Sequence, residues 1–301
     1  MREVAVVGGG PRGVAVLERV VAHARSRPPG VRLRLHLVEP HEPGPGSVWR
    51  VDQPAELVMN TDGSHVTLFP DPSVEVLGPT VPGPTLQEWC RLALALLADS
   101  PRADVDPEVA RVFAEGPAPT RTELDPVRDR LTAVLDGAFP SRAVYGLYLR
   151  WFFGRARALL PDGVEMVVHR TRAVACAPAA GGRYRLDLAD GTRLVVDAAV
   201  LATGWLAARR ETRAGLRHLP PGNPLDQGLE TVPPGTHLAV RGFGMNFFDA
   251  MVLLTVCRGG RFVPSGPDGS LSYRPSGAEP VLHVGSRRGV PFRGKAEGRL
   301  P

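Results

Sequence analysis

The feature that most constrains the fold of this chain is a glycine-rich turn between a short apolar strand and a helix, close to the N-terminus. Residues 4–7 form a continuous apolar run, which is typical of a strand buried in a parallel sheet. Apolar residues recur at helical spacing over 14–24, and a second predicted strand spans 33–38. A strand, a turn, a helix and a second strand within about forty residues predict a βαβ unit and an α/β fold.

The turn itself matches the pattern G-x-G-x-x-G through Gly8, Gly10 and Gly13. Gly8 permits a tight turn, Gly10 lets the backbone approach a pyrophosphate, and Gly13 lets the helix pack close to the strand. Pro11 and Arg12 stand at the start of the helix, where free N–H groups and the positive end of the helix dipole favour phosphate. This pattern in this setting predicts a dinucleotide-binding site.

Glu39 closes the second predicted strand, where a carboxylate accepts hydrogen bonds from an adenosine ribose. An acid at this place repels a 2′-phosphate, so the first site suits FAD or NAD rather than NADP. The competing interpretation is a structural glycine turn beside a surface glutamate. The strand, the glycines, the helix and the acid occur together, and this combination favours the dinucleotide site.

A long segment over 40–85 is rich in Pro, Gly, Asp and Ser and has no clear periodicity. A loop of this length inside a compact enzyme is usually functional. Asp62 and His65 are possible proton-transfer groups, although a single loop histidine is more often structural or exposed. The candidates for contacts with a flavin ring or its ribityl chain are Ser47, Trp49, Asn60 and Thr61.

The middle of the chain mixes predicted helices and short strands. Helices are expected over 86–97, 124–135 and 143–160, with a Pro/Asp-rich linker over 101–119. Short strands are expected over 164–168, 174–177, 184–188 and 194–196, with Asp190-Gly191 as a tight hairpin turn. Arg142 begins a predicted helix and is a candidate for cofactor phosphate, although an ordinary helix-start residue is equally plausible.

Another buried strand is expected over 198–202, and it ends in Thr203-Gly204. In flavoproteins with two dinucleotide sites, such a strand end passes beside the cofactor, so Thr203 and Gly204 are candidate contacts and Trp205 a candidate shield for the flavin. An ordinary strand-ending turn is the competing interpretation of this segment when it is taken alone.

A second βα arrangement follows, with a strand over 237–241, a turn at Gly242 and Gly244, and a helix over 247–256. Phe247 replaces the third glycine, which weakens the match. A short strand beginning at Val281 then closes on Ser286-Arg287-Arg288, which has no acid and offers bidentate donors to a phosphate. Arg287 is therefore a candidate for NADPH, and a solvated basic turn is the alternative.

These elements predict a Rossmann-like fold with two dinucleotide-binding domains. Residues 1–205 are expected to form an FAD-binding domain with a helical insertion at about 86–160, and residues 206–301 a short NAD(P)-binding-like domain.

The composition excludes several function classes. The net charge is +5, but basic residues do not alternate with aromatics, which argues against a nucleic-acid partner. The three cysteines are far apart and form no CxxC pair, which argues against a disulfide framework, a metal site and a disulfide-reductase type of flavoenzyme. Neither a signal peptide nor an apolar run of about 18 residues is present, so the sequence predicts a cytoplasmic protein with no membrane partner.

Several segments together resemble the FAD/NAD(P)-binding flavoproteins related to L-aspartate N-monooxygenase and FAD-dependent urate hydroxylase. The resemblance implies FAD, NADPH as hydride donor and O₂ as oxidant, in a monooxygenase that hydroxylates a small polar molecule. It fixes neither the substrate nor the oligomeric state. The segments that carry it are residues 5–13, 44–50, 59–61, 145–149, 202–204 and 286–291.

Members of that group are considerably longer than this chain. A truncated or degenerate dinucleotide-binding module without catalysis, and a simple NAD(P)H oxidoreductase without oxygen insertion, therefore remain as alternatives. No catalytic acid or base is identified in the sequence, and flavin monooxygenation does not require one.

Overall fold

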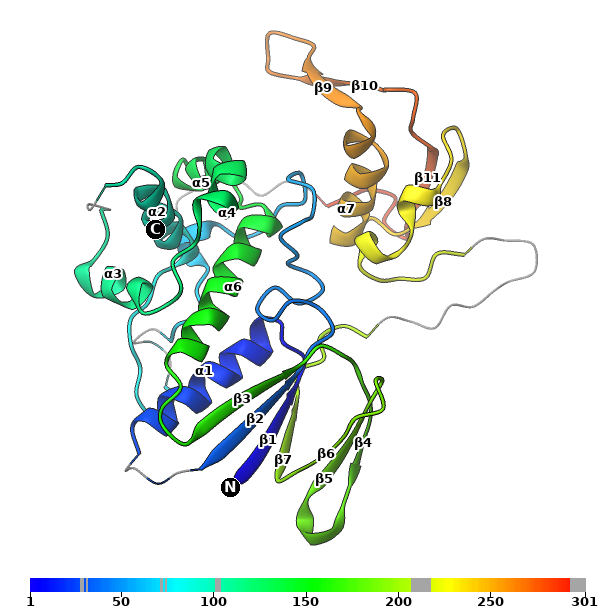
Figure 1. Ribbon diagram of the computed structural model, residues 1–301. Helices are drawn as coiled ribbons and strands as arrows, with labels where there is room; N and C mark the ends of the chain where they lie inside the picture. Colours follow the sequence, from blue (N-terminus) through cyan, green and yellow to red (C-terminus); the bar gives the residue numbers. More distant parts are fainter. Residues whose placement is uncertain are drawn as a thin grey trace. The chain divides into compact units, whose positions relative to one another are not determined.

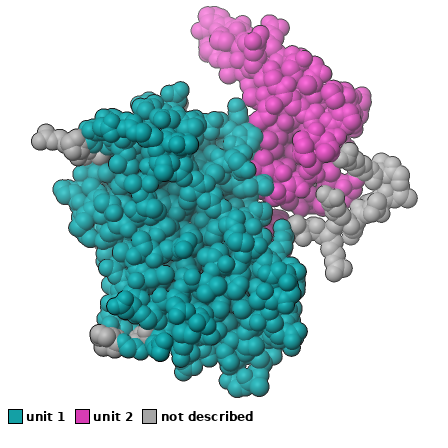
Figure 2. Space-filling model, in the orientation of Figure 1, with its two compact units in different colours: residues 1–204 teal, residues 205–301 magenta. Residues whose placement is uncertain are grey.

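The computed structural model describes residues 1–27, 30, 32–70, 73, 75–100, 104–206 and 218–292 (Figure 1). The chain divides into two compact units, residues 1–204 and 205–301 (Figure 2). Part of the predicted linker, 101–103, lies outside the described residues, as does the end of the chain from 293 onwards.

A four-stranded parallel sheet forms the centre of the first unit, with the strand order β3-β2-β1-β7. Val7 pairs with Val38 on one side and with Leu201 on the other, so these strands end at the same edge of the sheet. The predicted α/β fold with a parallel sheet is confirmed. The strands are β1 (Arg2–Val7), β2 (Leu33–Val38), β3 (Val164–His169) and β7 (Ala198–Leu201).

Helices cover one face of this sheet and form most of the core with it (Figure 1). Val6 and Leu37 of the sheet pack in one cluster with Val14 and Leu17 of α1 and with Tyr148 of α6. The helices are α1 (Pro11–Arg25), α2 (Leu86–Leu97), α3 (Pro107–Ala114), α4 (Arg121–Leu124), α5 (Arg128–Leu135) and α6 (Arg142–Ala158).

A three-stranded antiparallel sheet packs on the opposite face of the parallel sheet. Leu186 and Val196 of this sheet share a small core with Ala5 and Val38. Gly191 has φ +87° in the β5–β6 hairpin, so the predicted tight turn is confirmed. The strands are β4 (Ala173–Pro178), β5 (Tyr184–Leu188) and β6 (Arg193–Val196).

Two sequence predictions about helices were wrong. The predicted linker over 101–119 contains α3, because Asp106 caps the N–H of Glu108 at 2.7 Å and Val112 becomes fully buried. The predicted helix over 124–135 is broken into α4, the 3-10 turn Asp125–Val127 and α5, because Pro126 cannot donate a helical hydrogen bond.

The second unit has less regular structure. Strands β8 (His237–Arg241) and β11 (Val281–Gly285) pair in parallel, and α7 (Met245–Leu254) follows β8. Sequence analysis missed the antiparallel hairpin of β9 (Arg261–Pro264) and β10 (Leu271–Arg274). The other 3-10 turns among the described residues are Gly63–His65, Ala180–Gly182, Pro224–Asp226, Leu229–Thr231 and Val256–Arg258.

Candidate functional site

The first glycine of the turn lies against a neighbouring strand. The Gly8 N–H donates to the Val38 carbonyl oxygen at 2.9 Å, and Gly8 has φ +102°. A Cβ on Gly8 would lie 2.3 Å from the carbonyl oxygen of Ala202, just after β7. Only glycine allows β1 to turn this closely beside β7.

Gly13 and Gly10 differ in what surrounds them. A Cβ on Gly13 would lie 1.8 Å from the Gly8 carbonyl oxygen, so this glycine lets α1 start directly on the turn. Around Gly10, no heavy atom of the described residues, other than Gly10 itself and its chain neighbours, lies within 4 Å of the position of a Cβ. Gly10 is the N-cap of α1, with φ −73° and ψ −171°, and Pro11 follows it. Open space therefore faces the free N–H groups at the start of α1, and this cradle fits a pyrophosphate.

The Glu39 side chain points at this turn. Its side chain is 6% exposed, and Oε2 accepts a hydrogen bond from the Gly9 N–H at 2.7 Å. Its Oε1 accepts from the His41 N–H at 2.8 Å. Each carboxylate oxygen retains a second lone pair for a hydroxyl donor. The arrangement suits a ribose and disfavours a phosphate at the same place.

Two glycines to which sequence analysis gave no role bring the loop after β2 onto the turn. The Gly44 N–H donates to the Gly9 carbonyl oxygen at 2.7 Å, and a Cβ on Gly44 would lie 2.4 Å from the Leu149 carbonyl oxygen of α6. A Cβ on Gly46 would lie 3.1 Å from the Cα of Gly10. The motif Gly44-Pro45-Gly46 was the sequence signal that could have indicated a tight turn of this loop. Its two glycines have φ of +100° and +58°.

Arg150 holds the same loop through ion pairs. Its guanidinium donates to both carboxylate oxygens of Glu42, with Nη2 at 2.9 Å from Oε2. Nη1 donates to Glu123 Oε1 at 2.7 Å. The hydrogen bond that Arg150 donates to Glu42 raises the pKa of Arg150 above its usual value. Glu42 and Arg150 are 108 positions apart, so no local sequence signal connects them.

Trp49 is held by α6. Its ring makes an edge-to-face contact with Tyr145 at a centroid distance of 4.8 Å. A Cβ on Gly146 would lie 2.1 Å from the Trp49 carbonyl oxygen, so glycine is needed for this close approach. Ser47, two residues earlier, is partly buried. The flavin contacts predicted for Ser47 and Trp49 stay predictions.

The structure brings Arg142 beside the second part of the long loop. The Arg142 N–H donates to the Leu57 carbonyl oxygen at 2.8 Å, and Arg142 Nε donates to the Val58 carbonyl oxygen at 3.3 Å. Asn60 lies two residues after Val58, and its Oδ1 accepts a hydrogen bond from the Thr61 hydroxyl at 3.3 Å. Arg142, Asn60 and Thr61 thus belong to one neighbourhood, although 81 or more positions separate Arg142 from the other two.

Asp62 and His65 have local structural surroundings. Asp62 Oδ1 accepts hydrogen bonds from the Ser64 hydroxyl at 2.6 Å and from the Ser64 N–H at 2.8 Å. The Ser64 hydroxyl is the main cause of a lowered pKa for Asp62, which keeps this carboxyl ionised. His65 is exposed. Asp62 caps a 3-10 turn here, which favours the structural interpretation of both residues.

Thr203 lies next to the glycine turn, and Gly204 follows it in the chain. The Ala202 N–H donates to the Val7 carbonyl oxygen at 2.8 Å, and the Thr203 nitrogen lies 3.2 Å from the Cβ position of Gly8. Gly204 has φ +63° and, like Thr203, is exposed. Trp205 begins the second unit and is 82% exposed.

The second unit repeats the backbone of the first turn. Gly242 has φ +113°, and its N–H donates to the Gly285 carbonyl oxygen at 2.8 Å. Gly244 is the N-cap of α7 with φ −75° and ψ −179°, and, chain neighbours aside, no heavy atom in the part of the chain that the structure describes lies within 4 Å of its Cβ position. These φ and ψ values are close to those of Gly8 and Gly10 in the first turn. In this equivalence β11 takes the place of β2, and Ser286 takes the place of Glu39.

Around the second turn, aromatic and basic side chains replace the third glycine and the acid. Phe247 makes an edge-to-face contact with Phe243 at a centroid distance of 5.0 Å. Arg287 is exposed, and the Arg288 guanidinium lies 5.8 Å from the centre of the Phe292 ring. The strand end therefore offers cationic donors where the first unit has a carboxylate.

Other kinds of site find no support in the described part of the chain. It contains no group of three or more His, Cys, Asp and Glu residues that could hold a metal ion. None of its helices is long and apolar enough to cross a membrane. Cys90, Cys176 and Cys257 form no disulfide bond, and burial raises the pKa of the Cys90 thiol, which makes Cys90 an unreactive core residue.

Comparison with known proteins gives matches over most of the chain. The FAD-NAD(P)-binding family matches residues 5–206. L-aspartate N-monooxygenase (nitrosuccinate-forming) of Streptomyces davaonensis is 44% identical over 312 residues, which cover 98% of this chain and 44% of that protein. Nitrosuccinic acid synthase of Aspergillus oryzae is 40% identical and is covered to 41% of its length. A lysine monooxygenase structure from Nocardia farcinica has a TM-score of 0.43 at 17% identity, covering 83% of this chain and 54% of that chain. This chain therefore spans less than half the length of these curated relatives.

Proposed function

This chain belongs to the FAD-NAD(P)-binding family, and we propose that it acts as an FAD-dependent, NADPH-using monooxygenase that hydroxylates a small polar molecule. The observation that carries the proposal is the open cradle at Gly10 beside the buried carboxylate of Glu39. The relatives are named after L-aspartate and nitrosuccinic acid, so L-aspartate is the first substrate to test.

The first turn would hold the ADP half of FAD. Gly8 and Gly13 shape the turn, and the N-terminal N–H groups of α1, with Pro11 and Arg12, face the pyrophosphate. Glu39 would accept hydrogen bonds from the ribose. When bound, FAD supplies hydride acceptance and oxygen activation, and the protein supplies orientation and exclusion of water.

Residues of the long loop and of the β7 end would complete the flavin site. Gly44 and Gly46 place the loop directly on the turn, which supports contacts from this loop to the cofactor. The proposed contacts are Ser47, Trp49, Asn60, Thr61, Arg142, Thr203 and Gly204.

The second turn would bind NADPH. Gly242 and Gly244 repeat the phosphate-binding backbone of the first turn. Ser286 stands where Glu39 stands in the first unit, and Arg287 follows it. A hydroxyl and a guanidinium at this strand end favour a 2′-phosphate, because no carboxylate there repels it.

We also propose an FAD domain over 1–205, with its helical insertion at about 86–160, and an NAD(P)-binding-like domain over 206–301. The division into units at 204/205 supports this boundary. Cys90, Cys176 and Cys257 are not joined by disulfide bonds, which suits a reducing compartment and supports a cytoplasmic location.

An absorbance spectrum of the purified protein followed by an anaerobic NADPH titration tests the proposal. We expect a flavin spectrum that NADPH bleaches, and oxygen uptake with NADPH consumption that depends on L-aspartate or another small substrate. Colourless protein that does not take up added FAD would contradict the cofactor assignment. Flavin that NADPH fails to bleach would favour a non-catalytic module, and NADPH consumption that yields only peroxide would favour a simple oxidoreductase.

A further inference from the structure

The side chain of Gln53 is buried inside the loop that follows β2, where it is 6% exposed. Its Nε2 donates a hydrogen bond to the Val48 carbonyl oxygen at 3.1 Å and another to the Arg50 carbonyl oxygen at 2.6 Å. These two carbonyl groups stand on either side of Trp49 in the chain. The Gln53 amide therefore closes a turn around Trp49.

The oxygen of the same amide has no partner. Within the part of the chain that the structure describes, Gln53 Oε1 is buried and accepts no hydrogen bond. Rotating the amide by half a turn would not help, because Oε1 would then face two carbonyl oxygens, which only accept hydrogen bonds. A buried acceptor without a donor is unfavourable. The two carbonyls around Trp49 thus require the N–H groups of an amide, and the unpaired Oε1 is the consequence.

Helix α6 fixes Trp49 from the other side. A Cβ on Gly146 would lie 2.1 Å from the Trp49 carbonyl oxygen, and the Trp49 ring meets the Tyr145 ring edge to face. The Trp49 N–H donates to the Pro45 carbonyl oxygen at 3.3 Å. With Gln53 on the flanking carbonyls, the indole is held in one direction.

The same loop lies on the cradle at the start of α1. A Cβ on Gly46 would lie 3.1 Å from the Cα of Gly10. Trp49 follows Gly46 by three positions, and the Cα atoms of such a segment are at most about 11 Å apart. The Trp49 side chain is only partly buried. An indole that is held rigidly this close to the cradle suits contact with a planar ring of a bound cofactor.

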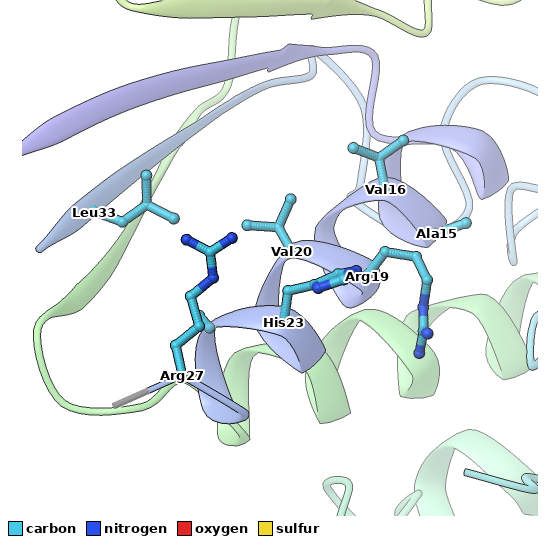
Figure 3. Close-up of a pocket in the computed structure, with 8 residues that line it drawn as sticks. Ala15, Val16, Arg19, Val20, His23, Arg27 and Leu33 are labelled. Carbon is cyan, nitrogen blue, oxygen red and sulfur yellow. The ribbon is translucent and has the colours of Figure 1, made fainter. Parts of the chain in front are cut away.

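An open groove on α1 is separate from this turn. It has a volume of about 630 Å³ and is lined by Val16, Val20 and Leu33 among others (Figure 3). None of the described residues that line it belongs to the loop over 44–53. A substitution in this groove therefore changes the packing of the first unit without altering the turn around Trp49.

We propose that Gln53 is a positioning residue of the flavin site, whose amide holds the Trp49 indole in the direction in which it contacts the isoalloxazine ring. This inference rests on the proposed function, because it needs FAD in the cradle. Gln53 is buried within the turn, so it acts on the cofactor through Trp49.

The fluorescence of bound flavin tests the proposal. An indole in contact with a flavin quenches its emission, because the indole passes an electron to the excited ring and then takes it back. At saturating FAD we expect the emission to rise at least about threefold in both Trp49→Leu and Gln53→Leu. The Kd for FAD of Gln53→Leu should stay within about fivefold of the unmodified protein, because the cradle and Glu39 are unchanged. If Gln53→Leu fails to fold by circular dichroism, Gln53→Glu replaces it, since a carboxylate has the same size and no N–H donor.

Two controls separate positioning from a general loss of stability. Gln227→Leu removes a glutamine of the second unit whose Nε2 also donates to a backbone carbonyl oxygen, that of Pro220, at 2.6 Å. Val20→Ala removes apolar contacts in the groove on α1 (Figure 3). Both variants should leave the flavin emission within about 1.5-fold of the unmodified protein.

Unchanged emission in Gln53→Leu, where Trp49→Leu raises it, would overturn the proposal. Unchanged emission in Trp49→Leu, or an equal rise in the two controls, would overturn it as well. Protein that takes up no FAD contradicts the proposed function and this proposal together. Uptake of FAD without these changes in emission contradicts this proposal alone.

Discussion

Substituting Gly10 by alanine should weaken cofactor binding much more than it destabilises the fold. Gly10 has φ −73°, which every L-residue adopts, and among the described residues beyond its chain neighbours the new Cβ would meet no heavy atom within 4 Å. Alanine is a poorer N-cap than glycine, so we expect a loss of about 1 kcal/mol in the free energy of unfolding. For a unit of this size that loss corresponds to a decrease in Tm of about 2–4 °C.

The effect on FAD affinity should be much larger. The added methyl group projects into the space in front of the α1 N-terminus, where the pyrophosphate would approach the backbone N–H groups. Hydrogen bonds to charged groups contribute about 1.5–3 kcal/mol each, so weakening one or two of them costs about 2–3 kcal/mol. The Kd for FAD should therefore rise about 30- to 150-fold.

Titration of the apoprotein with FAD, followed by flavin fluorescence, measures this change. Gly244→Ala is the matched control, because Gly244 is also an N-cap, with φ −75° and equally open surroundings. We expect it to leave the Kd for FAD within twofold and to weaken NADPH binding instead. A folded Gly10→Ala variant that binds FAD within threefold of the unmodified protein would refute this interpretation of the turn.

Three further predictions concern stability. Gly13→Ala places a Cβ 1.8 Å from the Gly8 carbonyl oxygen, so it should cost more than about 2 kcal/mol in chemical denaturation. Burial, and then His36, lower the pKa of His169 from its usual value of 6.5. Below about pH 6.5 the folded protein therefore binds fewer protons than the unfolded chain, so its Tm should fall from pH 7.5 to pH 5.5. The fall should be smaller in His169→Gln. Arg150→Met removes the ion pairs that hold the loop after β2, so limited proteolysis should cut this loop faster.

Local sequence patterns predicted most of the first unit. The bounds of β2, α2 and β5, and of β8 in the second unit, agree with the expected ranges, because each has a clear periodicity or apolar run between turn residues. The glycine turn and Glu39 were also predicted as one site, because their spacing reports a local βαβ geometry. Short elements without such a pattern, such as α3 and the β9–β10 hairpin, were missed.

The amino-acid sequence by itself determined that a nucleotide-type turn would form here, since strand, glycines, helix and acid lie within one short stretch. Only the tertiary structure decided what closes around that turn: Gly8 lies against the end of β7, Gly44 fits between the turn and α6, and Arg150 reaches Glu42. The contacts of these residues with β7 and α6 join positions more than a hundred residues apart. Their geometry depends on how the parallel sheet orders its strands and packs α6, and no local pattern of residues encodes that order.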